Sequence, residues 1–572
     1  MIYHLSGVCG TGKTEQLISN IEQIKNPETS IILWASLTNK LSEATCNRYT
    51  ERYPEHNAAV ISSENSSSVQ TEILQRLESE SSLTTQILFI SHTALSMLTL
   101  DTLSQCTVII DEIPTLIGSY QRLKISMQDE SVLGLAPYIE YKDSSFDGFQ
   151  HVVVKEEIRK KAKKFAYDLI LNGDPNSDSV KAGKMLMGGI HNSNGLYVST
   201  AGKWRLFEFF DGLEFISKLR QLDTVWLLSA NLEGLFVEKL LQALNCSITT
   251  EHVLSHLNLP TTHPNTSNVE ILPFLMNSSK EQSSSFSSYF ASYQASKVIK
   301  DCSEEFDVHQ LFNRWVSDLF KDQQFIYCKN KHTPPISCSN AIELPPMAQG
   351  LNGYSHLNEV AFMPHLRPAP EHKAAIKRLA KDIEICQQSL VDSYLKQTSY
   401  EAAYQFVSRI SFRNLNRDEN GSLAQEQTQP SCKIVVPDMA HAEYIQRMMP
   451  TASINTSSSY QRVPTQASTE EIAQRQTKKA ARKAIRDAEK QKRDFSTLFI
   501  IHQLIEGGQT AKNACEAMGI TPRTRRNWLE QYGEDWTNWL AEQELSKELE
   551  GEKELSRVSR ILCNCLDLSL KG

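Results

Sequence analysis

The stretch that decides the fold is Gly7-Val8-Cys9-Gly10-Thr11-Gly12-Lys13-Thr14, near the start of the 572-residue chain. It follows the apolar run Ile2–Leu5 and precedes Glu15–Ile18, so a strand, a glycine-rich turn and a helix are predicted in that order. The spacing is that of the Walker A pattern: a Gly, four residues, and then Gly-Lys followed by Ser or Thr. Such a strand and loop open parallel α/β sheets, whose ligands bind at the carboxyl ends of the strands.

The loop has the composition of a triphosphate site. Its glycines let backbone N–H groups point inward at phosphate oxygens, while Lys13 places a cation near the β and γ phosphates. The Thr14 hydroxyl can ligate Mg²⁺. A chance glycine-rich turn would need neither the strand nor the helix, so we predict ATP and Mg²⁺ as cofactors. The predicted nucleotide-binding residues are Gly7, Gly10, Thr11, Gly12, Lys13 and Thr14.

A second apolar run ends in two acids. Val108-Ile109-Ile110 leads directly into Asp111-Glu112, and charges at the end of a buried strand lie where open α/β sheets bind ligands. An ordinary strand-to-loop junction would also tolerate these acids, but the same chain carries Lys13. We therefore interpret the pair as a Walker B motif, with Asp111 as a Mg²⁺ ligand and Glu112 polarising the water that attacks the γ-phosphate.

The totals describe a large multidomain chain. With 572 residues it has room for three or more folded units, since domains usually hold about 100 to 200 residues. Hydrophobic residues make up 40%, charged residues 22%, and the mean hydropathy is -0.36. No apolar run approaches the ~20 residues of a membrane helix. The N-terminus has no basic segment before a long apolar stretch, so neither an export signal nor a membrane partner is expected.

The spacing of the cysteines and the net charge limit which cellular compartment and which class of partner are expected. The 12 cysteines include no Cys-x-x-Cys spacing, so neither a zinc site nor a disulfide framework is indicated, and reduced thiols in the cytoplasm are expected. The net charge of -8 does not mark the whole protein as a polyanion binder. Any nucleic-acid partner therefore has to be argued from local segments.

Short apolar runs alternate with helical stretches in the first part of the chain, which predicts the βαβ rhythm of a parallel sheet. Strands are expected at Ile2–Leu5, Ile31–Ala35, Ile87–Ile90, Val108–Ile110 and Thr224–Leu228. Residues 1-117 and 223-260 are therefore assigned to a first α/β domain. Residues 118-222 are interpreted as an inserted subdomain, in which Gly188-Gly189 and the turn before Leu196 suggest a hairpin.

A second βα series follows a Ser-rich stretch around Ser283–Ser288, which has the composition of a surface linker. Strands are expected at Phe325–Cys328, Val360–Met363 and Ile434–Val436, and helices near Glu371–Leu390 and Tyr400–Ile410. Residues 300-464 are assigned to a second α/β domain. Residues 465-494, rich in Lys, Arg and Ala, predict an exposed basic helical linker, and residues 495-572 predict a helical domain.

The order of these motifs resembles that of superfamily 2 helicases, the DEAD/DEAH-like group, over roughly Met1 to Asp438. Gly10–Thr14 resembles motif I, Ala35–Leu41 motif Ia, Asp111–Pro114 motif II, Leu228–Asn231 motif III, Gly350–Asn352 motif V and Gln405–Arg409 motif VI. The sequence departs from the pattern at four places: Pro114 ends motif II, Asn231 replaces a Thr, Ser408 replaces a Gly, and Arg413 follows Arg409 by four residues where the usual spacing is three. The resemblance implies two RecA-like P-loop NTPase domains that hydrolyse ATP between them.

Phosphoryl transfer calls for an arginine from the second domain, because a cation that arrives on closure stabilises the charge on the transferring oxygens. Arg409 and Arg413 are the candidates, since a spacing of four would place both on one helical face. The alternative is that they are solvated or bind a nucleic-acid backbone. In related enzymes residues such as Ser229 and Gln405 couple the γ-phosphate to the nucleic-acid track. The predicted catalytic residues are Lys13, Glu112, Arg409 and Arg413.

A helix-turn-helix pattern lies near the C-terminus. A short helix is predicted at Ala511–Met518, a turn at Gly519, and a second helix with Thr521 as its N-cap and Pro522 in its first turn. The apolar residues expected to pack these two helices together are Ala514, Met518, Ile520, Trp528 and Leu529. The segment resembles the helix-turn-helix units of transposases and bacterial regulators. That resemblance assigns nucleic-acid binding to Arg523, Thr524, Arg525, Arg526 and Asn527. A helical hairpin used for protein contacts is the alternative.

Together these features predict an ATP-dependent nucleic-acid helicase or translocase, with DNA as the favoured partner. An ATP-hydrolysing DNA-binding switch or replication-initiation protein that does not unwind is the main alternative. Replication or mobile-element proteins would suit either interpretation as further partners. A P-loop kinase acting on a small molecule is disfavoured by the second α/β domain.

Overall fold

The computed structural model comprises two compact units, Met1–Val463 and Pro464–Gly572. It describes residues 1–25, 31–65, 69–78, 85–114, 117–128, 133–146, 148–172, 174, 177–191, 195–201, 203–251, 253–257, 259–264, 266–276, 288–331, 333–346, 353–414, 431–462, 469–518 and 520–543. Within these ranges, no helix is both long enough and apolar enough to cross a membrane.

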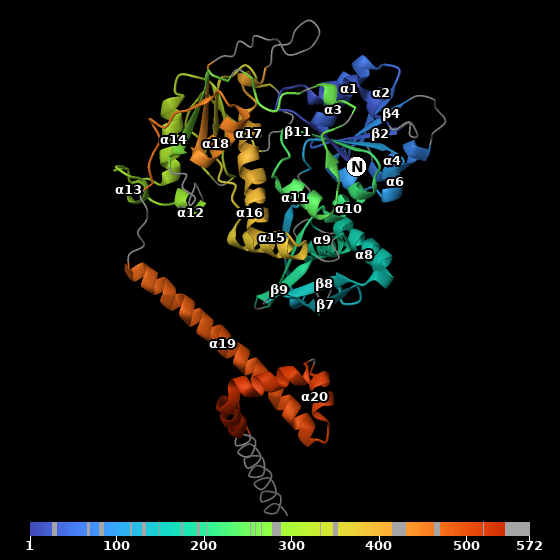
Figure 1. Cartoon of the computed structure of the whole chain (residues 1–572), viewed down its shortest axis with the longest axis vertical. Coiled ribbons are helices and arrows are strands. Elements are labelled where there is room, and N and C mark those ends of the chain that lie inside the picture. The colour runs from blue at the N-terminus through green and yellow to red at the C-terminus, as the bar shows by residue number, and fades with distance from the viewer. Residues whose placement is uncertain are drawn as a thin grey trace, which may run out of the picture. The chain divides into compact units, whose positions relative to one another are not determined.

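The first unit opens with a seven-stranded sheet in which all neighbouring strands are parallel (Figure 1). In sheet order the strands are β12 (Ile248–Thr249), β1 (Ile2–Ser6), β11 (Val225–Ser229), β5 (Thr107–Asp111), β2 (Ile31–Ser36), β4 (Gln86–Ser91) and β3 (Asn57–Val60). Each strand predicted for the first domain is present. β2 is buried at every position, as a strand covered by helices on both faces must be, and this is why it reads as a continuous apolar run.

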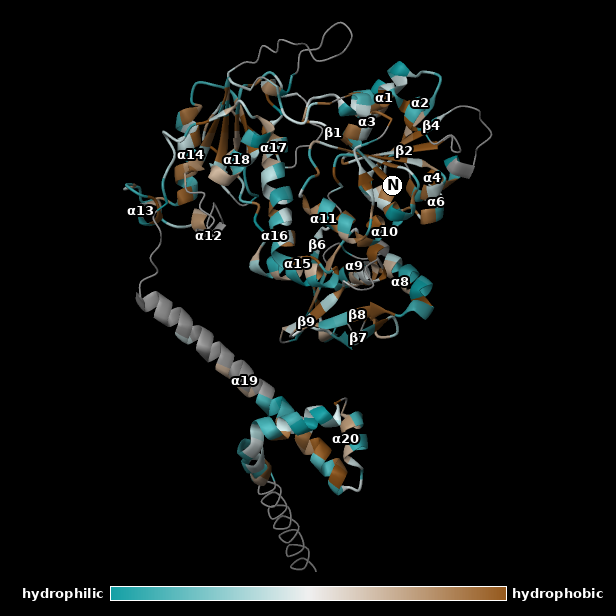
Figure 2. Ribbon diagram, in the orientation of Figure 1, coloured by the Kyte–Doolittle hydropathy of each residue, from teal (hydrophilic) through white to brown (hydrophobic). Residues whose placement is uncertain are grey.

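Helices cover both faces of this sheet. They are α1 (Lys13–Ser19), α2 (Ile21–Ile24), α3 (Asn39–Arg52), α4 (Val69–Glu78), α5 (His92–Met97), α6 (Leu100–Ser104), α10 (Leu213–Gln221) and α11 (Phe236–Ala243), followed by the 3-10 turn η2 (Ser255–Leu257). Alternate residues of β2 supply the two cores: Leu33 lies in one, and Trp34 in the other. Figure 2 shows the hydrophobic strands enclosed by helices with mixed faces.

Between β5 and α10 the chain builds a five-stranded antiparallel sheet of order β6-β10-β9-β8-β7. Its elements are β6 (Tyr120–Ser126), β7 (Ile139–Asp143), β8 (Gln150–Val154), η1 (Glu156–Ile158), α8 (Arg159–Asn172), α9 (Asp178–His191), β9 (Tyr197–Ala201) and β10 (Trp204–Phe210). α8 and α9 pack on one face, where Ile125, Val152 and Phe207 meet Ala166. The alternation along β6 places Arg122 and Lys124 on the other face. We call these elements the inserted sheet.

The predicted hairpin at Gly188-Gly189 is wrong, because both glycines lie inside α9. A Cβ at Gly188 would stand 2.6 Å from the ring of Phe209, and one at Gly189 would stand 2.8 Å from Val154. Neither space would admit a methyl group in a close-packed interior. The glycines therefore serve close helix-to-sheet packing, and the hairpin is the β9–β10 pair further on.

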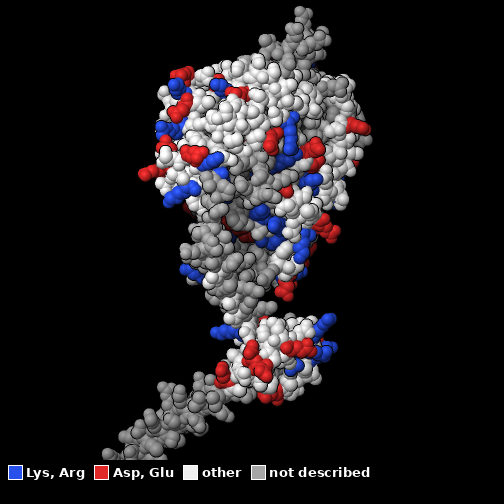
Figure 3. All heavy atoms as spheres, turned by 60° about the vertical axis from the view of Figure 1, so that its left-hand side comes forward, with Lys and Arg blue, Asp and Glu red and all other residues white. Residues whose placement is uncertain are grey.

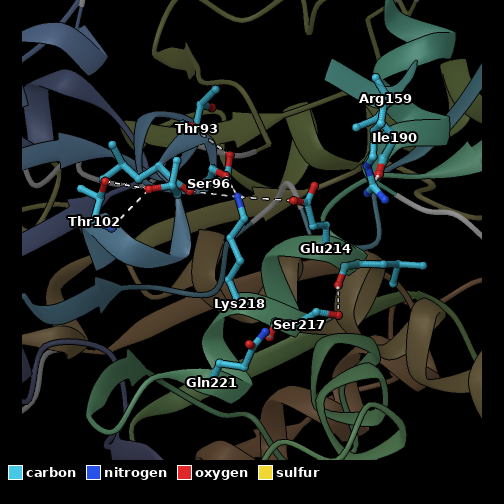
Figure 4. Close-up of polar contacts among 12 residues, drawn as sticks. Thr93, Ser96, Thr102, Arg159, Ile190, Glu214, Ser217, Lys218 and Gln221 are labelled. Atoms are coloured by element: carbon cyan, nitrogen blue, oxygen red, sulfur yellow. Dashed lines mark hydrogen bonds and ion pairs between the residues drawn. The ribbon is translucent and has the colours of Figure 1, made fainter. Parts of the chain in front are cut away.

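The chain leaves the first sheet and returns to it at one point, where Gly118 N donates to Asp211 O (2.9 Å) and Asp211 N to Ser119 O (2.8 Å). The sequence interpretation includes α10 in the insertion, but α10 packs in the core of the first sheet. Lys218 of α10 donates to the carbonyl oxygens of Ser96 (3.0 Å) and Leu98 (2.9 Å), at the end of α5 (Figure 4). This partly buried ammonium satisfies carbonyls that α5 leaves unpaired.

The third sheet has six parallel strands. In sheet order they are β15 (Ala341–Glu343), β14 (Phe325–Cys328), β16 (Glu359–Phe362), β17 (Cys432–Asp438), β13 (Val269–Leu275) and β18 (Ser453–Ile454). Its helices are α12 (Ser288–Ala291), α13 (Ala295–Val298), α14 (Val308–Leu319), α15 (Pro370–Asp382), α16 (Gln387–Leu395), η3 (Lys396–Glu401), α17 (Ala402–Val407), η4 (Ser411–Arg413) and α18 (Met439–Met448). Since β13 pairs with β17, this sheet starts before residue 300, where the sequence places the second domain. The predicted linker around residue 283 lies largely outside the described residues.

One long helix is predicted over Glu371–Leu390, but the structure has two, α15 and α16. Glu384 between them has a φ of 57°, a left-handed conformation that no helix continues. Ile376, Leu379 and Leu390 from this pair lie in a core of the first sheet rather than of the third. The fold class is nonetheless the predicted one: two parallel α/β sheets, an insertion and a helical C-terminal unit.

The second unit is helical in its described part, with α19 (Thr469–Glu506), α20 (Ala511–Ala517) and a helix over residues 522–543. The predicted boundary between residues 494 and 495 falls inside α19. The predicted packing of the last two helices on each other is wrong, because each packs on α19. Ala514 meets Ile501 in one cluster, whereas Trp528 joins Phe495 in another.

Candidate nucleotide site

A cavity of about 220 Å³ lies beyond the carboxyl ends of β1 and β5 and is bounded on its other side by the chain around α17. All four predicted catalytic residues line it: Lys13, Glu112, Arg409 and Arg413. So do the predicted metal ligands Thr14 and Asp111, and Gly10 and Gly12 of the loop. The cavity thus brings together residues about 400 positions apart in the sequence.

Left-handed backbone shapes the loop before α1. Gly10 has a φ of 85° and Gly12 a φ of 77°, conformations that only glycine adopts at low cost. A Cβ on Gly10 would stand 2.3 Å from the carbonyl oxygen of Arg413, so the loop and the chain after α17 are in close contact. Gly7 and Thr11 do not line the cavity, but Gly7 accepts from Lys13 and the Thr11 hydroxyl donates to Val8 O (2.9 Å).

Lys13 is buried, and its ammonium group donates to Gly7 O (2.6 Å) and Val8 O (3.3 Å). These two carbonyl oxygens hold the cation at the floor of the cavity. A phosphate oxygen in the cavity could replace either of them as the acceptor of a stronger, charge-assisted bond.

The acidic pair stands opposite the loop. The Thr14 hydroxyl donates to Asp111 Oδ2 at 3.4 Å. Burial raises the pKa of Asp111 to about 7, with Glu112 adding to the effect and Lys13 opposing it. A hydroxyl and a carboxylate oxygen are hard donors of the kind Mg²⁺ takes, and the ion would favour the ionised carboxylate.

Glu112 has a strained backbone. Its φ of 71° lies in the left-handed region, which costs a non-glycine residue about 1 kcal/mol or more and clusters at functional sites. Its N–H donates to Leu228 O (2.9 Å) on β11, which holds this conformation. Among the described residues, its buried Oε2 atom has no hydrogen-bond partner. The carboxylate is therefore held at the cavity with one oxygen available to a ligand.

The two arginines reach the cavity in a way that helical spacing does not explain. Helix α17 ends at Val407, ahead of both, and Arg413 lies in the 3-10 turn η4. The predicted shared helical face is therefore wrong, although both side chains line the cavity. Arg409 is 6% exposed, and burial, followed by the charge of Arg413, lowers its pKa to about 10. It stays protonated at neutral pH.

Tyr404 and His263 were not predicted from the sequence. The N–H of Cys9 in the loop donates to the Tyr404 hydroxyl (3.1 Å), which also bonds His263 Nε2 (2.9 Å). Burial, with Lys13 and Arg413 acting in the same direction, lowers the pKa of His263 to about 3, so its ring is neutral. A buried tyrosine one position before Gln405 carries no sequence signal of its own.

A second group of residues joins the two sheets, and of these Glu401 and Tyr444 were not predicted from the sequence. Gln405 Nε2 donates to Glu401 Oε1 (3.1 Å), and the Tyr444 hydroxyl donates to Glu401 Oε2 (2.6 Å). Asn231 Nδ2 donates in turn to the Tyr444 oxygen (3.0 Å). Gln405 lines the nucleotide cavity, so this series runs from the cavity to the end of β11. Ser229, one of the weaker candidates, bonds His4 Nε2 instead (2.8 Å).

The remaining predicted stretches are placed as follows. In Ala35–Leu41, Thr38 caps α3 and Leu41 lines the cavity, together with Arg48, which pairs with Glu15. Gly350–Asn352 lies outside the described residues. In the second unit the Thr521 hydroxyl accepts from Thr524 N (3.1 Å) at the start of the helix over residues 522–543. The five candidate nucleic-acid-binding residues follow Pro522 in its first turns, and Arg523, Arg526 and Asn527 are exposed.

Comparison with known proteins yields no family. No protein-family model matches the chain, and no curated protein matches it. Among solved structures, one titled XPD_APO is 13% identical with a TM-score of 0.43, covering 80% of this chain and 97% of that chain. One titled XPD_Helicase is 10% identical with a TM-score of 0.41, covering 80% and 96%. A variant of S. cerevisiae Dbp5 bound to RNA and ADP BeF3 is 9% identical with a TM-score of 0.29, covering 83% and 88%. Such distant similarity carries no argument about activity, which rests on the site itself.

Proposed function

We propose that this chain hydrolyses ATP between its two parallel sheets and uses the reaction to translocate along or unwind nucleic acid, with DNA as the favoured substrate. One observation carries the proposal: Lys13, Glu112 and Arg409 face a single cavity from two different sheets. A site divided in this way changes shape when its two sides approach, so hydrolysis can be coupled to movement.

Each of these side chains has one task. Lys13 binds the β and γ phosphates and exchanges a carbonyl partner for a phosphate oxygen. The available oxygen of Glu112 orients the attacking water and accepts its proton. Arg409 and Arg413 place positive charge where the transferring phosphoryl oxygens accumulate negative charge. Since burial keeps Arg409 poorly solvated, its charge acts on the transition state with little competition from water.

The Thr14 hydroxyl and the Asp111 carboxylate would hold Mg²⁺, which when bound would neutralise negative charge on the β and γ phosphates. Both residues belong to short rigid junctions, the first turn of α1 and the end of β5. They therefore hold the nucleotide in one orientation relative to Glu112.

The nucleic-acid part of the proposal is supported by the order of the motif-like stretches and by the exposed arginines of the second unit. It is tested by phosphate release from the full chain with and without single-stranded DNA, beside Lys13→Ala. We expect DNA to increase the rate of phosphate release by the wild type and to have no such effect on the variant. A wild-type chain that releases no phosphate would refute the proposal. A strand-displacement assay then separates a helicase from the alternative, a DNA-binding switch that hydrolyses ATP without unwinding.

A further inference from the structure

Helix α15 lies across the outer face of the inserted sheet, the face that α8 and α9 leave uncovered. Arg378 of α15 pairs with the buried carboxylate of Glu208 on β10. The Tyr197 hydroxyl of β9 donates to Asp382 Oδ2 of α15 (2.6 Å). These two contacts from successive strands set the direction of the helix relative to the sheet. The inserted sheet and α15 are thus one packed assembly.

Strand register places cations and an aromatic ring beside the helix. On the face of the sheet that α15 crosses, Lys124 of β6 stands opposite Leu206 of β10, and Trp204 lies two residues before Leu206. Lys124 Nζ lies 4.2 Å from the centre of the Trp204 ring, and Lys203 Nζ lies 5.7 Å from it. The two lysines are exposed, and the tryptophan is half-buried. An indole ring is therefore held in place by cations at the open end of the sheet.

The open flank of α15 carries a row of lysines. Lys373, Lys377 and Lys381 recur every four residues along the helix. Lys381 already has contacts just after β7, at the far edge of the inserted sheet: its Nζ donates to Ser145 Oγ (3.2 Å) and lies 4.8 Å from the centre of the Phe146 ring. Arg378 points to the inserted sheet, and Leu379 lies in the core of the first sheet, so Lys373 and Lys377 occupy the remaining flank. Among the described residues, Lys373 and Lys377, like Lys124 and Lys203, take part in no ion pair. Figure 3 shows Lys and Arg side chains spread over one face of the first unit, with Asp and Glu side chains among them.

The lysine row of α15 borders the strip that holds Trp204. His372 of α15 stacks on Tyr120 (4.3 Å between ring centres), and Phe210 beside Tyr120 belongs to the core of the first sheet. The core-facing side of α15 therefore lies toward the Tyr120 end of the strands. Its lysine side must lie toward the other end, where Lys124 and Trp204 are. The lysine-bearing flank of α15 and the outer face of the inserted sheet thus form a corner, and both carry lysines.

We propose that this corner, formed by Lys124, Lys203 and Trp204 of the inserted sheet and by Lys373 and Lys377 of α15, binds single-stranded nucleic acid. We call it the lysine corner, and it deepens the proposed function by naming a part of the strand's path. The cations meet backbone phosphates, and one unpaired base stacks against Trp204. The charge favours a polyanion, because nearby carboxylates already have partners: Glu208 pairs with Arg378, and Asp382 accepts from Tyr197.

The test measures binding of the full chain to fluorescein-labelled oligothymidylate by anisotropy over a range of salt concentrations. Lys124, Lys373 and Lys377 are replaced jointly by Gln. The slope of log affinity against log salt concentration should then become less negative by about 2, because each lost phosphate contact with single-stranded DNA contributes about 0.7 to that slope. Trp204→Ala should weaken binding by about fivefold or more because the base no longer stacks, and Trp204→Phe should restore much of it. Melting temperatures equal to the wild type establish that the variants fold.

The matched control replaces Lys160, Lys161 and Lys164 of α8 by Gln. It removes the same charge from exposed positions of a helix that packs on the opposite face of the inserted sheet, so binding should be unchanged. If the wild type binds and its ATP hydrolysis responds to the oligonucleotide, but corner and control variants behave alike, the lysine corner is refuted and the proposed function stands. If the wild type does not bind the oligonucleotide, both the corner and the nucleic-acid part of the proposed function are refuted. Equal loss of single-strand and duplex binding in Trp204→Ala would refute the stacking role.

Discussion

Glu401 offers the sharpest test of how the site is organised. It is buried, and burial raises its pKa to about 7, against the opposing hydrogen bonds from Tyr444 and Gln405. The folded state therefore holds this proton more tightly than the unfolded state, in which a Glu titrates near 4.5. Stability from this group is full below about pH 4.5 and is lost as the pH rises through about 7. At about 1.4 kcal/mol for each pH unit, the full loss amounts to about 3.5 kcal/mol.

Glu401→Gln should abolish this loss, because an amide of the same shape does not titrate. Urea unfolding of the full chain at about pH 5 and pH 8 measures most of it, and the variant should lose less stability over that interval than the wild type by about 2.5 kcal/mol. Glu443→Gln on α18 is the matched control, since that carboxylate is exposed and precedes Tyr444. It should follow the wild type.

The same substitution should slow catalysis. In the wild type Gln405 gives its NH₂ group to Glu401, which fixes the amide orientation at the nucleotide cavity. In the variant, the amide at position 401 can present its own NH₂, and Gln405 must then turn its oxygen away from the cavity. We expect kcat to fall about tenfold, as when one hydrogen bond to a charged group is removed, with little change in KM for ATP. An unchanged pH dependence of stability, or an unchanged kcat, would refute the assigned position of Glu401.

Further outcomes follow from the same geometry. Lys13→Ala should abolish phosphate release while the circular dichroism spectrum stays that of the wild type; hydrolysis at the normal rate would refute the ATP site. Glu112→Gln should still bind ATP in a filter assay but fail to turn it over, and normal turnover would assign the water-orienting role elsewhere. Arg409→Lys should lower kcat far more than it raises KM, because a point charge cannot reproduce the planar guanidinium; a pure KM effect would count against a transition-state role. A chain ending at Val463 should retain basal ATP hydrolysis and bind duplex DNA more weakly, and equal duplex affinity at matched salt would assign the second unit to a protein partner.

Local sequence was enough to predict the first sheet and its phosphate loop. The runs Ile31–Ala35 and Ile87–Ile90 are apolar throughout because their strands are covered on both faces, and the loop spacing follows from phosphate geometry. The Gly188-Gly189 pair failed as a turn signal for the opposite reason. Its meaning depends on Phe209 and Val154, which pack against α9 from other elements, and such packing leaves no local periodicity.

The site was predictable where one short segment carries the chemistry and not where distant segments share it. Lys13 and Glu112 were found from their own neighbours in the sequence. Tyr404 could not be, because its role exists only through Cys9, 395 positions away. The two arginines were found by their order in the chain, but the reason given, a shared helical face, fails because α17 ends before them.

The π-helix η3 contains Glu401 and also takes part in a second group of buried hydrogen-bonded residues. Ser399 within it bonds His441 Nε2 (2.9 Å), whose Nδ1 bonds Asp438 Oδ1 (2.6 Å), and all three residues are buried. A hydroxyl, an imidazole and a carboxylate in this order could suggest a hydrolase, but a side chain only 1% exposed cannot meet a substrate. Their role is structural: Asp438 ends β17, so this series ties η3 to the third sheet, while Gln397 of η3 accepts from Val237 N (2.9 Å) in α11, which packs on the first sheet. Asn231 follows β11 of the first sheet, and Tyr444 lies in α18, beside the third sheet. A movement of one sheet relative to the other would therefore lengthen or break the hydrogen bond between Asn231 and Tyr444.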